Sequence, residues 1–192
     1  MAVKTFTTET LTSADTNTYL ANSGLVYVAG GALSSTATNF QGVFTSTYAN
    51  YRMVIGGFGS SVIQYLVFQM LSATTPATGA NYYTCMTGIT SSNVISSIPL
   101  ATATSGYLGY NYQADSTSRA SSCSFDIMGP ALTQQTQLIG TSQGYATGTL
   151  VFNAWSGATN HSLTTSYDGI RIFNLGSGTI GGDVRIYGYR QA

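Results

Sequence analysis

The single histidine of the chain, His161, is the first residue that could support catalysis. A Ser–His–Asp triad needs an imidazole beside both a serine hydroxyl and a carboxylate. His161 lies in the polar run SGATNHSLTTS, residues 156–166, whose composition predicts a long surface loop. We therefore expect a solvated loop histidine rather than a general base.

Four aspartates are the candidates for paired-carboxylate chemistry, because two carboxyl groups on either side of a glycosidic bond could hydrolyse it. Asp168 and Asp183 come just before predicted strands, at turn positions where Asp commonly accepts hydrogen bonds from nearby backbone. We expect neither these two nor Asp115 and Asp126 to form an acid/base pair. The protein is therefore predicted not to be an enzyme.

Motifs for phosphate or metal binding are missing from the sequence, which contains no GxxxxGK[ST] and no CxxC pattern. The glycines of GSGTIGG join two predicted strands without a following helix, so we interpret them as a hairpin connection and not as an anion cradle. Cys85 and Cys123 match no metal spacing, and we expect two small buried thiols. A disulfide would require their strands to be neighbours. No cofactor or metal is predicted.

Tyrosines give a stronger signal, because a tyrosine offers a large contact area with a polar tip. Within GYLGYNYQ, residues 106–113, Tyr110 and Tyr112 share one strand face and Tyr107 falls on the other. Such side chains suit a subunit interface or stacking on a sugar, and they equally suit half-buried sheet positions. The candidate contacts with a partner or glycan are Tyr82, Tyr83, Tyr107, Tyr110 and Tyr112.

Composition limits the class of protein further. Only 6% of the 192 residues are charged and the net charge is zero, against roughly 25% charged residues in ordinary soluble domains. This favours association with copies of itself or with other proteins. The six basic residues provide no footprint for nucleic acid. No apolar run is long enough for a spanning helix, and the start has no apolar signal region, so we expect synthesis in a cytoplasm, with release only by lysis.

From residue 25 onward the sequence is rich in Thr, Val, Ile and Tyr, with Gly, Ser and Asn between the apolar runs. This texture predicts one domain, an all-β antiparallel sandwich of two sheets with jelly-roll topology. The run IQYLVFQML is apolar on both faces and predicts a central strand, whereas the Ser/Thr-rich segment 87–105 predicts a surface excursion. The predicted strands are 25–33, 38–44, 51–58, 63–72, 82–87, 106–113, 121–128, 137–143, 149–154, 167–174 and 183–189.

The closing segment YDGIRIFNLGSGTIGGDVRIYGYR, residues 167–190, alternates apolar and polar residues on both sides of a glycine cluster. The alternation predicts two paired strands. Arg171 and Arg185 would then be cross-strand or diagonal neighbours. Because unpaired arginines on a dry face are costly, we expect them to bind Asp168, Asp183 or carbonyl groups of a partner subunit.

The segment before residue 25 differs from the rest and contains the one predicted helix, residues 14–22. Thr12 or Ser13 can cap its start, and Gly24 suits its end. A helix of this length is not stable alone and must dock on something. We therefore divide the chain into residues 1–24, which contain the short helix, and a sandwich of residues 25–192.

Three segments together suggest a family. TLTSADTNTYLANSGLVYV near the start, VFTSTYANYRMVI at residues 43–55 and the closing segment resemble parts of tailed-phage virion proteins, particularly tail-fibre-like ones. The resemblance implies a jelly roll, often trimeric, on the tail or head of the particle. It also implies that residues 1–24 anchor the protein through Leu11, Tyr19 and Leu20. The chain has no coiled-coil or β-helical shaft, which favours a compact head-decoration, cement or short tail protein.

The sequence therefore predicts a non-enzymatic virion subunit, made in the cytoplasm of a bacterial host, that assembles as a homotrimer and with other virion proteins. The alternative is a receptor-recognition module that binds a host-surface glycan through the Tyr-rich segments. Neither nucleic acid nor membrane insertion is expected in either case.

Overall fold

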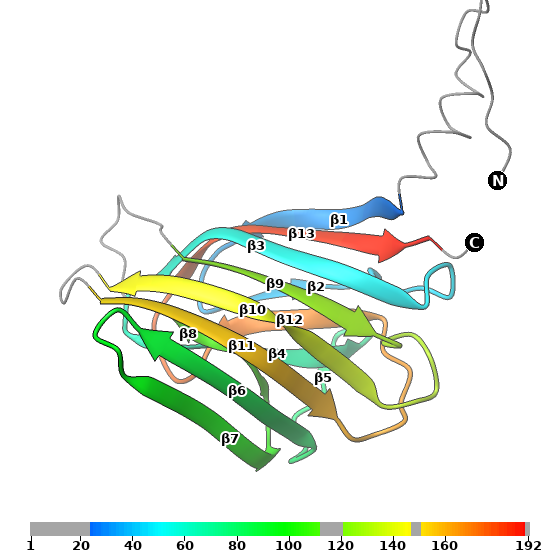
Figure 1. Ribbon diagram of the computed structural model, residues 1–192. Coiled ribbons are helices and arrows are strands. Elements are labelled where there is room, and N and C mark those ends of the chain that lie inside the picture. Colours follow the sequence, from blue (N-terminus) through cyan, green and yellow to red (C-terminus); the bar gives the residue numbers. More distant parts are fainter. Residues whose placement is uncertain (1–23, 112–120, 147–150, 191–192) are drawn as a thin grey trace, which may run out of the picture.

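The computed structural model describes residues 24–111, 121–146 and 151–190, and every regular element in these residues is a strand. The strands form two antiparallel sheets that face each other as a sandwich (Figure 1). The all-β sandwich predicted from the sequence is therefore confirmed. The predicted helix and the anchoring residues Leu11, Tyr19 and Leu20 lie outside the described residues.

We call the eight-stranded sheet the large sheet and the five-stranded sheet the small sheet. The large sheet contains, in spatial order, β1 (Leu25–Leu33), β13 (Ile180–Tyr189), β3 (Asn50–Ser60), β9 (Ser121–Met128), β10 (Thr136–Ala146), β11 (Val151–His161), β6 (Tyr82–Thr90) and β7 (Ile95–Ala103). The small sheet contains β2 (Ala37–Phe40), β12 (Gly169–Asn174), β4 (Gln64–Ser72) and β5 (Thr75–Pro76), with β8 (Gly106–Asn111) also paired to β4.

The connections between the sheets follow the order of a jelly roll. The chain alternates between the layers so that β1, β13, β3 and β9 lie side by side opposite β2, β12, β4 and β8. This is the arrangement that two interlocking Greek keys produce. Two pairs of strands extend the large sheet beyond the eight strands of the jelly roll. The pair β6 and β7 precedes β8 in the chain, and the pair β10 and β11 precedes β12.

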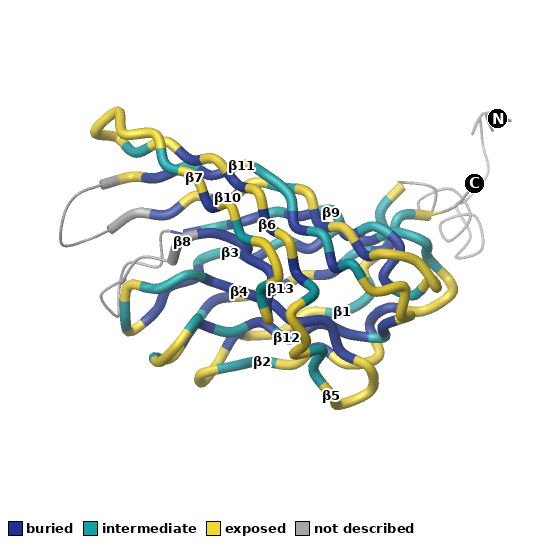
Figure 2. The backbone as a smooth tube through the Cα atoms, turned by 90° about the horizontal axis from the view of Figure 1, so that it is seen from below, coloured by how far each residue is buried: buried dark blue, intermediate teal, exposed yellow. Residues whose placement is uncertain are grey.

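Strand alternation fills the space between the layers with apolar side chains. On β9, Cys123, Phe125 and Ile127 are buried while the residues between them are only partly covered, as the sequence predicts. The central strand β4 is buried on both faces over most of its length, which confirms the interpretation of its apolar run. Figure 2 shows the same alternation of buried and more exposed positions along other strands.

The predicted closing hairpin is wrong. The strand β12 lies in the small sheet between β2 and β4, whereas β13 lies in the large sheet between β1 and β3. Arg171 faces Asn39 and Gln69 across the ladder, and Arg185 faces Gly30 and Val54, so the two arginines are not neighbours. Alternation shows only that each strand buries one of its faces. Strands of both sheets bury one face against the same core, so the pattern does not show whether two strands belong to the same sheet.

Two predicted loops are also wrong. Segment 87–105 is mostly the end of β6 and the edge strand β7, whose one partner leaves it too exposed for a clear apolar pattern. Residues 156–161 continue β11 instead of forming a loop. The glycine among them is required by close packing, because a Cβ on Gly157 would lie 2.2 Å from the carbonyl oxygen of Cys85 on β6.

A first prediction concerns the interior position of β13. Ile186 is completely buried, and its replacement by Ala should lower the free energy of unfolding by about 2–5 kcal/mol. Ile95→Ala is the matched control, because Ile95 is 73% exposed and should cost less than about 0.5 kcal/mol. Chemical denaturation measures both values, and equal losses for the two variants would contradict the placement of β13 inside the large sheet.

Candidate functional site

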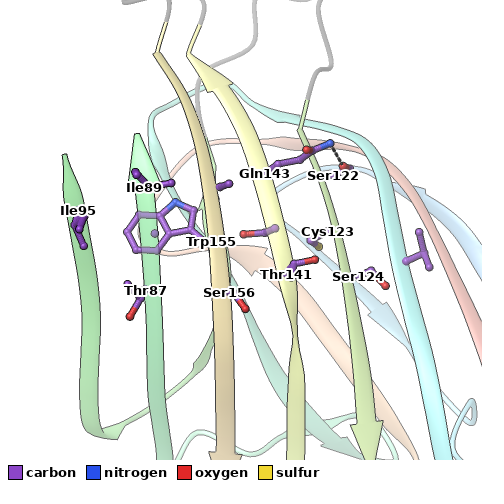
Figure 3. Close-up of a pocket in the computed structure, with 14 residues that line it drawn as sticks. Thr87, Ile89, Ile95, Ser122, Cys123, Ser124, Thr141, Gln143, Trp155 and Ser156 are labelled. Carbon is purple, nitrogen blue, oxygen red and sulfur yellow. Dashed lines mark hydrogen bonds between the residues drawn. The ribbon is translucent and has the colours of Figure 1, made fainter. Parts of the chain in front are cut away.

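A shallow hollow of about 700 Å³ lies on the outer face of the large sheet, away from the small sheet (Figure 3). It crosses from β3 to β7, and we call it the transverse groove because it runs across the strands instead of along them. Its lining residues are Val54, Thr87, Gly88, Ile89, Ile95, Ser122, Cys123, Ser124, Thr141, Ser142, Gln143, Ala154, Trp155 and Ser156.

One wall of the groove is a row of hydroxyl groups set by the strand register. Ser124 pairs with Thr141, Thr141 with Ser156, and Ser156 with Thr87. Directly paired residues of an antiparallel sheet share a face, and adjacent strands are about 4.8 Å apart. These four side chains therefore follow one another across β9, β10, β11 and β6, as Figure 3 shows. Ser97 on β7, opposite Thr87, continues the line, and we call the five residues the hydroxyl row.

The opposite wall is a second in-register row, two residues further along each strand. It begins with Ser122 and Gln143, whose amide Nε2 donates a hydrogen bond of 2.9 Å to the Ser122 hydroxyl. It then becomes apolar through Ala154, Ile89 and Ile95. The residues between the walls, such as Ser142 and Trp155, face the interior, so their backbone forms the floor.

Hydrogen bonding leaves part of the hydroxyl row available to a ligand. The Ser124 hydroxyl accepts a hydrogen bond of 3.2 Å from Arg52 Nε. The hydroxyls of Thr141, Ser156 and Thr87 have no hydrogen-bond partner among the described residues. Each can donate one hydrogen bond and accept up to two.

No charged residue lines the groove, and the charge of Arg52 beside it is neutralised by Asp126. Arg52 Nε lies 3.9 Å from Asp126 Oδ1, which also accepts a hydrogen bond of 2.6 Å from the Tyr189 hydroxyl. Partial burial, together with the hydrogen bond to Asp126, raises the pKa of Tyr189. This cluster stands where β13, β3 and β9 adjoin, at one end of the groove.

A second hollow of about 500 Å³ lies on the same face, further along β10, β11, β6 and β7. Tyr83, Cys85 and Ile139 are among its lining residues. Tyr83 is 41% exposed, so this predicted contact residue does lie at the surface.

Two other predicted tyrosine contacts, Tyr82 and Tyr107, are not on this face. Tyr82 is fully buried, and its hydroxyl accepts a hydrogen bond from the Met70 backbone amide and donates one to the Ala77 carbonyl. Tyr107 is buried and meets Tyr65 edge-on, with 5.0 Å between ring centroids. Both are core residues, so the expectation of surface contacts is wrong for them. The side chain of Tyr110 and the whole of Tyr112 lie outside the described residues.

His161 is not a solvated loop residue but the last residue of β11, with its side chain fully buried. Its imidazole meets the rings of Tyr82 and Tyr167 edge-on, with centroid distances of 4.4 and 5.2 Å. In the described part of the chain neither imidazole nitrogen has a hydrogen-bond partner, and Thr136 Oγ1, on the residue opposite, has none either. No triad is therefore formed there. Burial lowers the pKa of His161, and the nearby Leu163 backbone offsets only part of that shift.

The carboxylates have separate structural partners. Asp126 binds Arg52 and Tyr189, as described above, and Asp168 Oδ1 accepts a hydrogen bond of 2.8 Å from the Ala73 amide. Asp183 is exposed on β13, and Asp115 lies outside the described residues. Within residues 24–111, 121–146 and 151–190, no three His, Cys, Asp or Glu side chains could hold a metal ion together.

The two predicted interface arginines lie on the outer faces of different sheets. Arg171 stacks over the Phe173 ring, with 5.0 Å from its guanidinium carbon to the ring centroid. Arg185 is exposed in the same cross-strand line as Val54 and Ser124. Neither forms an ion pair with a described residue, so the expected local Asp partners are not found in that part of the chain.

Both cysteines are free thiols on strands that β10 and β11 separate. Cys123 is buried as expected, and burial raises the pKa of its thiol. Cys85 is exposed, which corrects the expectation of two buried thiols, because it occupies an outward position of β6 in the second hollow.

Comparisons with protein-family models, with curated proteins and with solved structures give no match to this chain. Among the described residues there is also no helix of sufficient length and hydrophobicity to cross a membrane. Function must therefore be inferred from the sequence and from the geometry above.

A second prediction follows from the buried imidazole. An unfolded histidine has a pKa of about 6.5, and the folded pKa is lower, so the unfolded chain binds the extra proton. The stability that the neutral imidazole contributes is complete above that pH and is lost as the pH falls below it. His161→Phe keeps an aromatic ring between Tyr82 and Tyr167 but cannot be protonated.

Urea denaturation at about pH 7.5 and about pH 5.5, on either side of the unfolded pKa, measures this effect. The natural protein should lose more stability than the His161→Phe variant at the lower pH. Equal losses for the two proteins would contradict the buried, unpartnered imidazole.

Proposed function

We propose that this protein is a non-enzymatic structural subunit on the surface of a tailed-phage virion, a compact jelly-roll accessory that assembles with itself and with other virion proteins. The resemblance of three sequence segments to such proteins supports the proposal, as do the jelly-roll topology and the low content of charge. The observation that carries the assembly role is an exposed apolar patch at one corner of the large sheet.

The patch consists of Ile89, Val94, Ile95 and Phe152, which are between 41% and 73% exposed. Ile89 and Ile95 face each other across β6 and β7, and the Phe152 backbone hydrogen-bonds to Ser91 at the tip of the same hairpin. Contiguous exposed apolar residues mark interaction sites more often than isolated ones do. No described residue covers them, so we assign the patch to contact with another subunit.

The patch supports contact through side chains more than pairing through the sheet edge. The hydrogen bond from the Thr90 amide to the Val94 carbonyl fixes which residues of β7 point their amides at β6. Because these amides alternate along β7, the backbone nitrogen of Pro99 faces away from β6, toward the free edge of the sheet. Proline has no amide hydrogen, so it interrupts the row of donors that an added strand would need.

A third prediction concerns assembly. Ile95→Glu should weaken self-association measured by light scattering, because it places a charge in the middle of the patch. Ile63→Glu is the control, because Ile63 is also an exposed isoleucine (47%, against 73% for Ile95), lies between β3 and β4 and is not part of the patch. A monomeric natural protein, or equal effects of the two substitutions, would contradict the role of the patch.

A fourth prediction concerns the particle itself. Quantitative mass spectrometry of purified virions should detect this chain as a component. An abundance close to that of the major capsid protein would indicate head decoration, and a few copies per particle would indicate a tail appendage. Absence from purified particles would contradict the proposed function.

The second candidate function is recognition of a host-surface glycan. The sequence suggested Tyr-rich segments for this role, but Tyr82 and Tyr107 are buried. The uncharged transverse groove favours the same function at a different place, because ligand sites are concave and combine apolar walls with a few polar groups.

A further inference from the structure

We propose that the transverse groove binds an extended, uncharged glycan chain that lies across the strands, with its sugar residues along the hydroxyl row. The proposal gives the second candidate function a site, a ligand class and a direction of binding. It does not depend on whether the protein belongs to a virion, because it follows from the outer face of the large sheet alone.

The repeat of the hydroxyl row is the first reason. The register places Ser124, Thr141, Ser156, Thr87 and Ser97 on five adjacent strands, so one hydroxyl recurs about every 4.8 Å. The length of one hexose in an extended chain is close to this spacing. Each sugar therefore meets one strand, and its hydroxyl groups can both donate to and accept from the side chain.

The availability of hydrogen bonds is the second reason. Thr141, Ser156 and Thr87 form the centre of the row and have no described hydrogen-bond partner. Facing them, Ala154, Ile89 and Ile95 supply an apolar wall for the C–H faces of the sugar rings. Ile89 and Ile95 also belong to the apolar patch, so a glycan in the groove would compete with a subunit for these two side chains. A volume of about 700 Å³ falls within the usual range for ligand sites.

The absence of charge is the third reason. None of the fourteen lining residues is charged. The nearest cation, Arg52, already donates to Ser124 and lies 3.9 Å from Asp126. No cation therefore lies along the groove floor or walls for an anionic polymer to bind, and the exposed Arg185 stands only beyond Val54, at the β3 end. A neutral chain needs no such cation.

A peptide fits less well than a glycan. Side chains on one face of an extended peptide recur about every 6.6 Å, which does not match a row with a repeat of about 4.8 Å. A peptide could otherwise add to the sheet at β7, but Pro99 interrupts that edge. These two mismatches favour the polysaccharide over a protein partner in the groove.

The test measures binding of the full chain to an array of linear oligosaccharides of neutral hexoses, including maltohexaose, cellohexaose, mannohexaose and bacterial surface glycans. The array also carries oligogalacturonate and a Ser/Gly peptide. We expect at least one neutral linear glycan to bind, with an affinity that changes little with salt, because no charged residue lines the site. Binding only to the anionic glycan or the peptide, or binding to nothing, overturns the proposal.

Two variants then locate the site. Ser156→Tyr fills the centre of the groove and should reduce affinity at least tenfold, whereas Thr141→Val removes one hydroxyl and should reduce it about three- to tenfold. Ser177→Tyr and Thr133→Val are the matched controls, because both residues are exposed in connections outside the groove. Equal affinity for Ser156→Tyr and the natural protein overturns the proposal.

Folding and assembly are controlled in the same samples. Thermal unfolding and light scattering of Ser156→Tyr should match the natural protein, since Ser156 is exposed and lies outside the apolar patch. If Ser156→Tyr fails to fold, Thr141→Val, which preserves side-chain volume, decides the question. A failure of the virion proposal would be seen in a separate experiment, as absence of the chain from purified particles.

Discussion

The register of five adjacent strands, β9, β10, β11, β6 and β7, decides what each face of the large sheet presents. A slip of one residue in any ladder would exchange the inner and outer side chains of that strand. Two glycines help to fix the pairing. A Cβ on Gly88 would lie 2.4 Å from the Trp155 ring, and one on Gly157 would lie 2.2 Å from the Cys85 carbonyl oxygen. A side chain at either place would clash in the observed pairing, so the observed contact depends on glycine.

The same register serves both the core and the groove. Trp155 and Met86 face inward because Ser156 and Thr87 face outward, and neither pair can turn without the other. The hydroxyl row therefore needs no loop to position it, and all of its strands except the edge strand β7 are hydrogen-bonded on both sides. A site on such a sheet is rigid before a ligand arrives, which limits the entropy lost on binding.

Local sequence patterns predicted many of the strands. The predicted strand 121–128 has the same bounds as β9, and the uninterrupted apolar run correctly predicted that β4 is central. Pattern could not assign β12 and β13 to different sheets, because both layers bury alternate residues against one core. The edge strand β7 was not predicted, because a strand with one partner keeps most of its side chains exposed and shows no clear apolar pattern. His161 was misplaced because the small residues before it resemble a loop, although they continue β11 and the glycine among them, Gly157, packs closely against β6.

The groove could not be foreseen at all, because its residues come from strands whose order in space differs from their order in the chain. Cross-strand nuclear Overhauser contacts in labelled protein test the register most directly. The account predicts backbone contacts that join Thr141 with Ser156 and Ser156 with Thr87. Contacts shifted by one residue, such as Thr141 with Trp155, would turn the hydroxyls to opposite faces and contradict it.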